Sequence, residues 1–217
     1  MNWKRHTGKQ QRRSYHHGNL REALIEAALA LIARKGPEGF TFAEAAREAG
    51  VSAAAPYRHF RDREALVLEV ARRGFEQFGA ALDRGWDGGQ PDPLVALKRV
   101  GVAYLEFARE EAPLFSAMFE SGISVAADRE LKATSDAAFD VVRRAAEQVC
   151  AGLDPSGRPP ASMVALHVWS LAHGIACLFA RGDQARRPLP MSAEDLLEAG
   201  VLIYLDGLGA RRTTPNK

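Results

Sequence analysis

Apolar residues recur at the three- and four-residue spacing of α-helices along most of the chain, and no alternating pattern indicates a strand. Glycine, proline and capping residues divide the apolar stripes into separate helices. The predicted helices cover 19–36, two short segments within 40–60, 62–82, 94–111, 113–121, 127–153, 160–181 and 192–209. The clearest break is GWDGGQPDP at 85–93. The sequence therefore predicts an all-α protein.

The stretch from Phe40 to Phe60 predicts two short helices joined by a tight turn. Thr41 can cap the first helix, and Glu44 three residues later can complete a capping box. Gly50 permits the left-handed backbone that such a turn needs, and a serine two residues later can cap the second helix. The second helix turns small and polar side chains outward, which suits close approach to phosphates and base edges. We interpret the segment as a helix-turn-helix that binds DNA.

This segment resembles the DNA-binding half of the TetR (tetracycline-repressor) family of regulators. The resemblance begins at LREALIEAALALIARKG (20–36) and continues through YRHFRDREALVLEV (57–70). Two residues depart from the family's pattern. Arg63 stands where the family usually carries a lysine on the phosphate backbone. Pro56 removes one backbone donor from the recognition helix, a loss that we expect to be tolerable near the first turn.

The net charge also differs between the N-terminal part of the chain and the remainder. Residues 1–78 hold 14 Lys and Arg against 9 Asp and Glu, a net +5, whereas the remainder holds 15 against 18, a net −3. The first acidic residue is Glu22, so an unopposed basic arm occupies 1–18. Such an arm is often merely solvated, but beside a helix-turn-helix it can follow phosphates or enter a minor groove. We expect a three-helix helix-turn-helix domain at 19–65 and a larger helical domain for ligand binding and dimerisation at 66–217.

The expected DNA contacts come from the basic arm, the start of the first short helix, the second short helix and the residues that follow it. They are Arg12, Arg13, Thr41, Ser52, Ala53, Ala54, Tyr57, Arg58, His59 and Arg63. The two alanines would read thymine methyl groups and Arg58 a guanine, while the other side chains would bind phosphates. The expected partner is double-stranded DNA with a palindromic operator, because a two-fold dimer presents two recognition helices.

Composition indicates a soluble globular protein, since 47% of the 217 residues are hydrophobic and 26% are charged. We expect no apolar run to approach the ~18 residues of a membrane helix, and the first residues lack the apolar core of a secretory signal. The two cysteines, Cys150 and Cys177, have no spacing that indicates a metal site or a disulfide framework. We therefore expect a cytoplasmic protein with no membrane contact, metal or cofactor.

Helix 160–181 carries an apolar stripe whose members lie alternately four and three residues apart, a seam suited to another helix. The resemblance implies that this helix and the last one form a four-helix dimer interface. The expected interface residues are Val164, Val168, Leu171, Ile175, Leu178, Leu197, Val201, Tyr204 and Leu208. Gly200 and Gly207 would permit close approach. The alternative is that both helices complete the core of a monomer.

A second stripe on helix 160–181 contains WSLAHG (169–174), which resembles a Trp-x-x-x-His-Gly feature of one TetR subgroup. Trp169 and His173 fall on one face, where they can either line a cavity or pack in the core. In this family the corresponding helices surround an inducer cavity. The expected ligand residues are Tyr104, Phe107, Phe115, Met118, Phe119, Phe139, Trp169, His173 and Cys177. Few charges interrupt these stripes, so the effector would be small and apolar or aromatic.

The sequence thus favours a dimeric repressor that a small ligand releases from its operator. An activator, or a regulator controlled by a protein partner, would have the same fold. An enzyme is a third hypothesis, because His173 and Cys177 lie four residues apart and imitate a catalytic Cys–His pair. The chain lacks a nucleophile elbow, paired metal ligands and a phosphate loop, so we expect no enzymatic activity.

Overall fold

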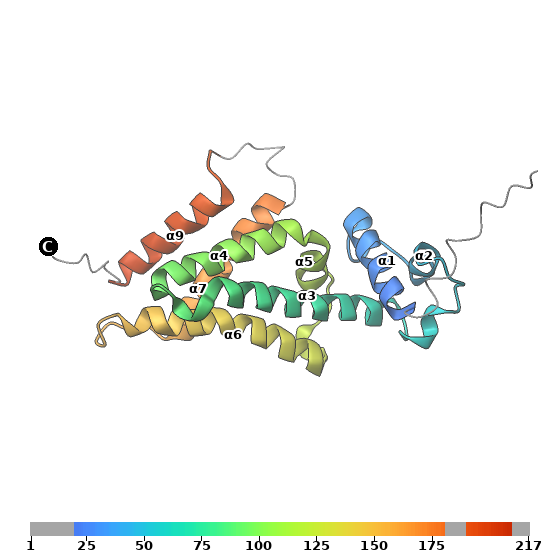
Figure 1. Cartoon of the computed structure of the whole chain (residues 1–217), viewed down its shortest axis with the longest axis horizontal. Helices are drawn as coiled ribbons and strands as arrows, with labels where there is room; N and C mark the ends of the chain where they lie inside the picture. Colours follow the sequence, from blue (N-terminus) through green and yellow to red (C-terminus); the bar gives the residue numbers. More distant parts are fainter. Residues whose placement is uncertain (1–19, 181–189, 210–217) are drawn as a thin grey trace, which may run out of the picture.

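The structure, a computed structural model, describes residues 20–180 and 190–209. The helices in these ranges are α1 (Leu20–Lys35), α2 (Phe42–Glu48), α3 (Arg63–Trp86), α4 (Pro93–Glu110), α5 (Ala112–Phe119), α6 (Arg129–Ala151), α7 (Ala161–Ala180) and α9 (Ala193–Gly207). No strand occurs in these ranges, so the prediction of an all-α fold is confirmed for them (Figure 1). The predicted DNA contacts of Arg12 and Arg13 lie outside the described residues.

Local capping places the ends of the N-terminal helices where the sequence predicts them. The Glu44 N–H donates to the Thr41 hydroxyl at 3.2 Å, and the Thr41 N–H donates to the Glu44 carboxylate at 2.8 Å, so both halves of the capping box form. Gly36 and Gly50 have φ values of 78° and 73°, the left-handed backbone that favours glycine. Asp62 caps α3 by accepting a backbone N–H at 2.8 Å.

The second helix of the DNA-binding motif is much shorter than predicted. Instead of an α-helix that begins at Ser52, the chain forms a turn, in which the Ala55 N–H donates to the Ser52 carbonyl at 3.0 Å, and then one 3-10 turn over Pro56–Arg58. Pro56 has no N–H to donate to the Ser52 carbonyl, and in an α-helix its ring would crowd that carbonyl. The prediction that this loss is tolerable is therefore wrong for an α-helix. We call residues 52–60 the recognition segment.

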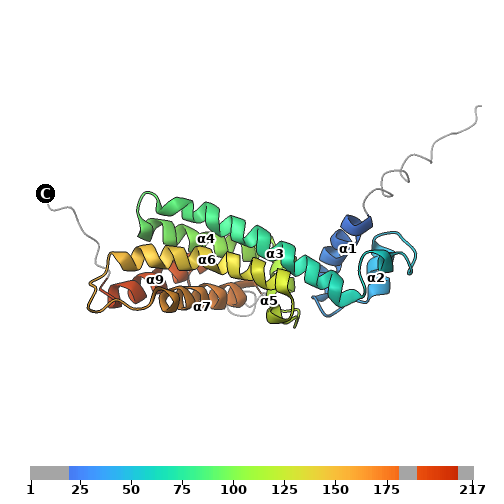
Figure 2. The same ribbon diagram turned by 90° about the horizontal axis from the view of Figure 1, so that it is seen from below.

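α3 runs without a break from the N-terminal helices into the C-terminal bundle (Figures 1 and 2). Buried side chains line it from Leu66 to Leu82, and it ends at Trp86 rather than at the predicted 82. The boundary that the sequence suggests between residues 65 and 66 falls in its first turn. A continuous helix, with no linker, therefore connects the N-terminal helices to the rest of the protein.

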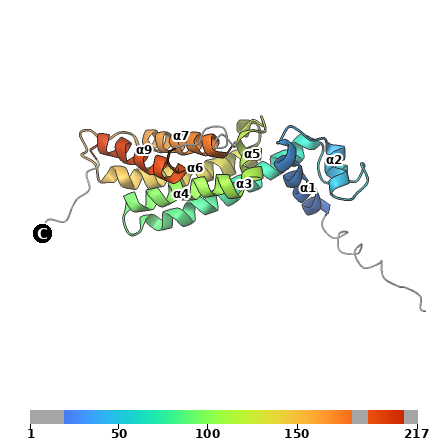
Figure 3. The same cartoon turned by 90° about the horizontal axis from the view of Figure 1, so that it is seen from above.

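The C-terminal bundle is built from α3, α4, α6 and α7, with α9 packed against α4 and α7 (Figure 3). α5 packs on α3 and also reaches α1, so it connects the bundle to the N-terminal helices. A Cβ at Gly85 would lie 3.0 Å from the Arg99 carbonyl oxygen, and a Cβ at Gly200 would lie 2.8 Å from the Leu171 side chain. The close approach at Gly200 is thus to α7 of the same chain. A Cβ at Gly207 would meet no atom of the described residues within 4 Å, so close approach to a partner helix stays a prediction at both glycines.

One described helix, α7, is long and apolar enough over Ala161–Phe179 to cross a membrane, by length and composition alone. The expectation that no apolar run approaches this length is therefore wrong. α7 packs against α4, α6 and α9, and its Val164 and Val168 side chains are buried. These contacts cover one face of the helix, and 33% of the span is buried within the described chain.

Candidate functional site

The recognition segment exposes the side chains that the sequence assigns to DNA. The exposed residues are Ser52, Ala53, Ala54, Tyr57, Arg58 and His59. Pro56 and Phe60 are buried and anchor the segment. The Tyr57 ring packs edge-to-face on Phe42 of α2, with ring centres 5.1 Å apart, although Tyr57 is 64% exposed. The segment thus presents methyl groups, a guanidinium, an imidazole and a phenol to solvent from a fixed backbone.

Thr41 at the start of α2 is also exposed, and its hydroxyl serves the capping box. The partner carboxylate of Glu44 accepts a second hydrogen bond from Lys35 at 2.7 Å. This bond, together with the one from the Thr41 N–H, lowers the pKa of Glu44 to about 2. Glu44 therefore stays ionised at physiological pH and holds the start of α2 beside the end of α1.

Arg63 is engaged within the protein. Its guanidinium carbon lies 4.9 Å from the centre of the Phe40 ring, and one of its nitrogens donates to the Pro37 carbonyl. The residue is half-buried, and its Nε has no hydrogen-bond partner. The predicted phosphate contact of Arg63 therefore disagrees with this arrangement, because the guanidinium would first have to leave Phe40 and Pro37.

A group of ion pairs joins α1 to α3 behind the recognition segment. Glu69 of α3 is 6% exposed and is the one buried charged residue in the described part of the chain. Its carboxylate lies 2.9 Å from nitrogens of Arg21 on α1 and of Arg72 and Arg73 on α3. Arg73 also donates through two nitrogens to Glu22 of α1. We call these five residues the α1–α3 ion-pair cluster.

In this cluster the contacts with arginines lower the carboxylate pKa values by more than burial raises them. Burial alone would raise the pKa of Glu69, but the hydrogen bonds from Arg72, Arg73 and Arg21 lower it to about 2. The hydrogen bond from Arg73 likewise lowers the pKa of Glu22. The sequence analysis missed these contacts. The available signal was a glutamate followed at three and four residues by arginines, inside a predicted helix.

Aromatic side chains from α3, α4, α5, α6 and α7 meet in the C-terminal core. This aromatic cluster consists of Phe78, Tyr104, Phe107, Phe115, Phe119, Phe139, Trp169 and His173, with neighbouring ring centres 4.8–6.4 Å apart. All of them except Phe78 are predicted ligand residues. The other two predicted residues lie near the cluster, because Cys177 contacts His173 and Met118 is buried against α3 beside Gly74.

His173 is the polar centre of the aromatic cluster. Its Nδ1 shares a 2.9 Å hydrogen bond with the Tyr104 hydroxyl, and its Nε2 lies 3.5 Å from Cys177 Sγ. Burial lowers the pKa of His173 and raises the pKa of Tyr104. Both groups are therefore neutral at physiological pH, and the cluster is an aromatic surface that contains these two neutral polar groups.

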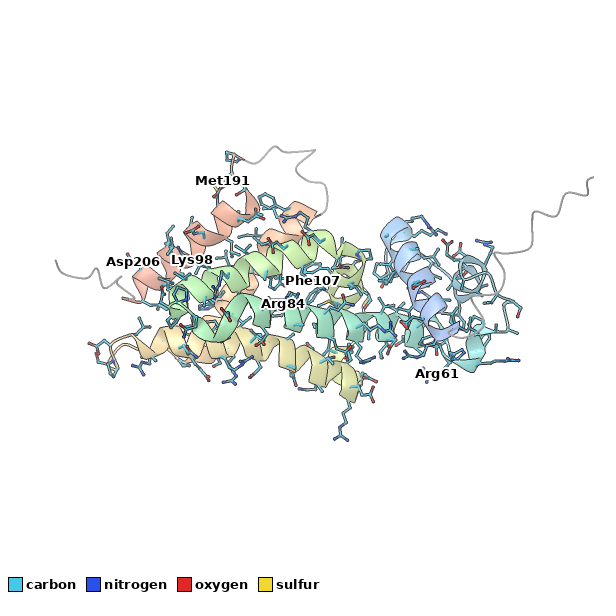
Figure 4. All side chains as sticks on the ribbon, in the orientation of Figure 1. Arg61, Arg84, Lys98, Phe107, Met191 and Asp206 are labelled. Atoms are coloured by element: carbon cyan, nitrogen blue, oxygen red, sulfur yellow. The ribbon has the colours of Figure 1, made fainter. Side chains whose placement is uncertain are left out.

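A cavity of about 510 Å³ lies between α3 and α4. Its lining is mixed, with apolar contributions from Ala81 and Phe107 and charged ones from Arg84 and Glu106. Figure 4 labels Phe107 on α4 and Arg84 on α3. Phe107 also belongs to the aromatic cluster, where its ring centre lies 5.1 Å from that of Phe78. This open, charged cavity differs from the apolar site that the sequence predicts, and the two meet at Phe107.

Most of the predicted dimer seam is buried inside the single chain. Five of its residues are at most 5% exposed: Val164, Val168, Ile175, Leu197 and Val201. A side chain that its own chain buries cannot contact a partner, so the prediction is wrong for these five. The other four are half-buried or exposed and stay predictions: Leu171, Leu178, Tyr204 and Leu208.

Both α7 and α9 expose large apolar side chains on the face opposite to their buried residues. Met163, Leu166 and Leu178 of α7 are 41%, 53% and 42% exposed, and Ile203 of α9 is 75% exposed. The three α7 residues fall on one side of the helix at 100° per residue. We call these four residues the exposed α7–α9 surface. The apolar period of α7 predicted two stripes, but it could not tell which of them its own chain covers.

Two family models match separate parts of the chain. Residues 24–70 match the model described as bacterial regulatory proteins, tetR family, and residues 97–203 match that of a tetracyclin repressor-like C-terminal domain. The first match contains α2, the recognition segment and the start of α3. The second runs from α4 into α9, so together the matches cover more than half of the chain.

Individual relatives agree with these matches. The HTH-type transcriptional regulator BetI of Agrobacterium fabrum is 44% identical over 52 residues, which are 24% of this chain and 25% of BetI. The chain thus spans about a quarter of the length of this curated relative. A solved protein of unknown function from Rhodococcus sp. RHA1 is 30% identical, with a TM-score of 0.75 over 90% of this chain and 98% of the other. The TetR family transcriptional regulator PfmR of Thermus thermophilus is 24% identical, with a TM-score of 0.64 over 85% of this chain and 96% of PfmR. The chain therefore belongs to the tetR family of bacterial regulatory proteins.

Proposed function

We propose that this chain is a dimeric transcriptional repressor that leaves a palindromic operator when a small apolar ligand binds its C-terminal core. Members of its family are DNA-binding transcriptional regulators and not enzymes. The observation that carries the proposal is the recognition segment, which exposes Ala53, Ala54 and Arg58 while Pro56 and Phe60 anchor it. Such a regulator acts in the cytoplasm, where it has access to DNA.

DNA reading in this proposal is divided among the exposed side chains of the recognition segment. The methyl groups of Ala53 and Ala54 suit thymine methyl groups, and Arg58 can donate two hydrogen bonds to a guanine. Tyr57 and His59 bind phosphates and set the register of the segment in the major groove. The small side chains before Pro56 keep this surface low, so the backbone itself comes close to the bases.

The exposed α7–α9 surface supplies the dimer contact in this proposal. Soluble monomers rarely leave large apolar side chains gathered on one surface, and Ile203 is the most exposed large apolar residue of the described chain. Of the remaining predicted residues, Leu178 belongs to this surface, Leu171 and Tyr204 lie on the same two helices, and Leu208 caps the end of α9. An isologous contact between two copies would place the recognition segments about a two-fold axis, as a palindrome requires.

The aromatic cluster supplies the effector site. Its rings contact one another, so a ligand would enter by displacing some of them, which favours a small apolar or aromatic molecule. Trp169, His173 and Gly174 would then be the Trp-x-x-x-His-Gly feature of the proposed subgroup. Phe115 and Phe119 belong to α5, which also reaches α1. A ligand that binds better to a shifted α5 would therefore move the DNA-binding helices.

Selection of binding sites from random duplex DNA with the full chain tests the DNA-binding part. At near-physiological salt we expect a palindrome with one fixed half-site spacing. Recovery of unrelated sequences alone, with affinity that falls steeply as salt rises, would mean that the protein binds phosphates without reading bases. That result would refute a sequence-specific regulator.

The selected duplex then serves as the probe for a ligand screen. Release of DNA should coincide with a change in the fluorescence of Trp169, measured in a Trp3→Phe/Trp86→Phe background. Transcription in vitro from a promoter that overlaps the selected site gives the sign of regulation. Stimulated transcription would show an activator, and full retention of the operator with every ligand would favour control by a protein partner.

A further inference from the structure

The α1–α3 ion-pair cluster lies where α3 passes from the DNA-binding helices to the C-terminal bundle. A buried carboxylate needs charged partners to offset its lost hydration, and Glu69 has Arg21, Arg72 and Arg73 within 2.9 Å. Well-packed apolar residues often give equal or greater stability than such a network. Charge-assisted hydrogen bonds do, however, fix the direction of a contact as well as its length. Orientation is therefore the property that this cluster supplies and an apolar contact would not.

Arg21 connects the cluster to the recognition segment. One of its nitrogens lies 2.9 Å from the Glu69 carboxylate, and its guanidinium carbon lies 5.5 Å from the centre of the Phe60 ring. Phe60 is buried and closes the recognition segment two residues after Arg58. Contacts thus run from the DNA-facing segment through Phe60 and Arg21 to α3.

A second contact fixes the rotation of α1 about α3. Arg73 of α3 donates through two nitrogens to Glu22, the neighbour of Arg21 on α1. Adjacent residues of a helix point about 100° apart, so two such attachments restrain both position and rotation. α1 cannot turn on α3 without breaking at least one of these ion pairs.

We infer that Arg21 and Glu69 are positioning residues for operator reading. They hold the recognition segment at a fixed angle to α3, and α3 carries this angle into the bundle through which the two copies associate. The pair therefore sets which spacing of two half-sites the dimer accepts. This inference rests on the proposed function, because half-site spacing has meaning for a two-fold operator alone.

The test compares the selected palindrome with duplexes that have one base pair added to or removed from the centre. One base pair changes the separation of the half-sites by about 3.4 Å and their relative rotation by about a tenth of a turn. The wild-type chain should bind the selected spacing at least about tenfold more tightly, the value of one lost base contact. In Arg21→Gln and Glu69→Gln this ratio should fall below about threefold, while the preference for the half-site sequence remains.

Arg143→Gln is the matched control. Arg143 on α6 also pairs with acids three and four residues away, Asp140 and Glu147, but it lies on the C-terminal bundle. Arg143→Gln removes one positive charge, as Arg21→Gln does, and should leave the spacing ratio at the wild-type value. Circular dichroism checks that each variant is folded. Arg21→Gln is the milder change, because the side chain of Arg21 is 41% exposed and that of Glu69 is 8% exposed.

The outcomes separate this inference from the proposed function. A folded Arg21→Gln that keeps the wild-type spacing ratio overturns the positioning role, even if it binds all DNA more weakly through the lost charge. Loss of half-site preference in step with loss of fold also overturns it, because the cluster would then be merely structural. A wild-type chain that selects no palindrome refutes the proposed function itself, and the inference with it.

Discussion

Arg58 and Tyr57 are neighbours in the recognition segment but should affect DNA binding in different ways. Arg58→Ala should cost about 1–3 kcal/mol on the selected operator and relax the preference at one base pair. Tyr57→Phe should weaken binding to all duplexes alike, by about 1 kcal/mol, because it removes one hydrogen bond to a phosphate. Fluorescence anisotropy with the operator and with a scrambled duplex separates the two. Equal loss on both duplexes in Arg58→Ala would exclude base reading by Arg58.

Tyr104 and Tyr204 each share a hydrogen bond with a histidine, but the first bond is partly buried and the second is exposed. Tyr104→Phe should lower the free energy of unfolding by about 1–3 kcal/mol, because it removes a buried hydroxyl and leaves Nδ1 of the half-buried His173 without its partner. Tyr204→Phe removes the bond to His167 at a solvated position and should change stability by less than about 0.5 kcal/mol. Urea unfolding of both variants tests the difference. Similar losses in the two would show that burial is not what gives the Tyr104 bond its value.

The partial burial of His173 should make stability depend on pH. Burial lowers the pKa of the folded histidine below the 6.5 of the exposed side chain, with a smaller opposing effect from Glu120. As the pH falls through 6.5, the unfolded chain takes up a proton that the folded chain does not, so the free energy of unfolding decreases until the pH passes the folded pKa. Between about pH 7 and about pH 5.5, wild type should therefore lose more stability than His173→Asn does. Parallel losses would show that His173 does not titrate differently in the two states.

Single residues also decide how far the DNA-facing surface can be predicted. The caps at Thr41 and Asp62 follow from rules that act within three residues, and both are present. The conformation of the recognition segment depends on two opposing effects. Its shape depends on whether the donor missing from Pro56 outweighs the helical preference of three alanines, and on the burial of the proline ring. Sequence rules identify the effects of the proline and of the alanines, but they do not say which of them determines the conformation.

At the level of helices, Gly85 of α3 lies in close contact with α4. A Cβ there would lie 3.0 Å from the Arg99 carbonyl oxygen and 3.3 Å from the Ala103 Cβ, and neither group can move aside as a flexible side chain would. Gly85→Ala should therefore lower the free energy of unfolding by about 1–3 kcal/mol. Thermal unfolding measures the loss.

Gly207→Ala is the matched control for Gly85→Ala. It adds the same methyl group at the end of α9, where no atom lies within 4 Å of the new Cβ. Its stability should stay the same or rise by up to about 1 kcal/mol, because alanine favours the helix. A stabilised Gly85→Ala would mean that α3 and α4 are free to separate.

The helices themselves were predictable because their apolar period and capping residues are local, whereas their partners were not. The stripe from Val164 to Leu178 has the spacing of a helix–helix seam, and that spacing holds equally for a core of one chain and for an interface of two. The structure buries Val164, Val168 and Ile175 within the chain and leaves Leu166 outside. Amphipathicity identifies an apolar face, but only the fold of the chain determines what covers it.

At the scale of the whole molecule, the exposed α7–α9 surface should control the oligomeric state. Ile203→Glu places a charge at the most exposed of its side chains and should convert a dimer to a monomer, because an unpaired charge in an apolar contact costs several kcal/mol. Sedimentation velocity at micromolar concentration measures the change. Val95→Glu, at a 39% exposed apolar residue of α4, is the control and should stay dimeric. A dimeric Ile203→Glu would place the interface elsewhere.

The α1–α3 ion-pair cluster shows what sequence patterns miss at this scale. Arg73 and Glu22 lie 51 positions apart in the chain, and their contact depends on how α1 crosses α3. Periodicity within either helix carries no information about that crossing. The aromatic cluster was easier to predict from the sequence, because large rings at helical spacing on successive helices tend to meet in one core.

The length of α3 gives small movements in the bundle a large effect at the DNA. Its 24 residues make it about 36 Å long. The part of α3 between Phe78 and Arg63 is a lever about 23 Å long, so a tilt of about 5° at the aromatic cluster moves the DNA-binding end by about 2 Å, enough to break a hydrogen bond of about 3 Å. A ligand that displaces Phe78 by a fraction of a ring width could therefore lift Arg58 off a base edge. If the proposed function holds, release of the operator needs no large rearrangement, and the direction of the tilt matters more than the size of the ligand.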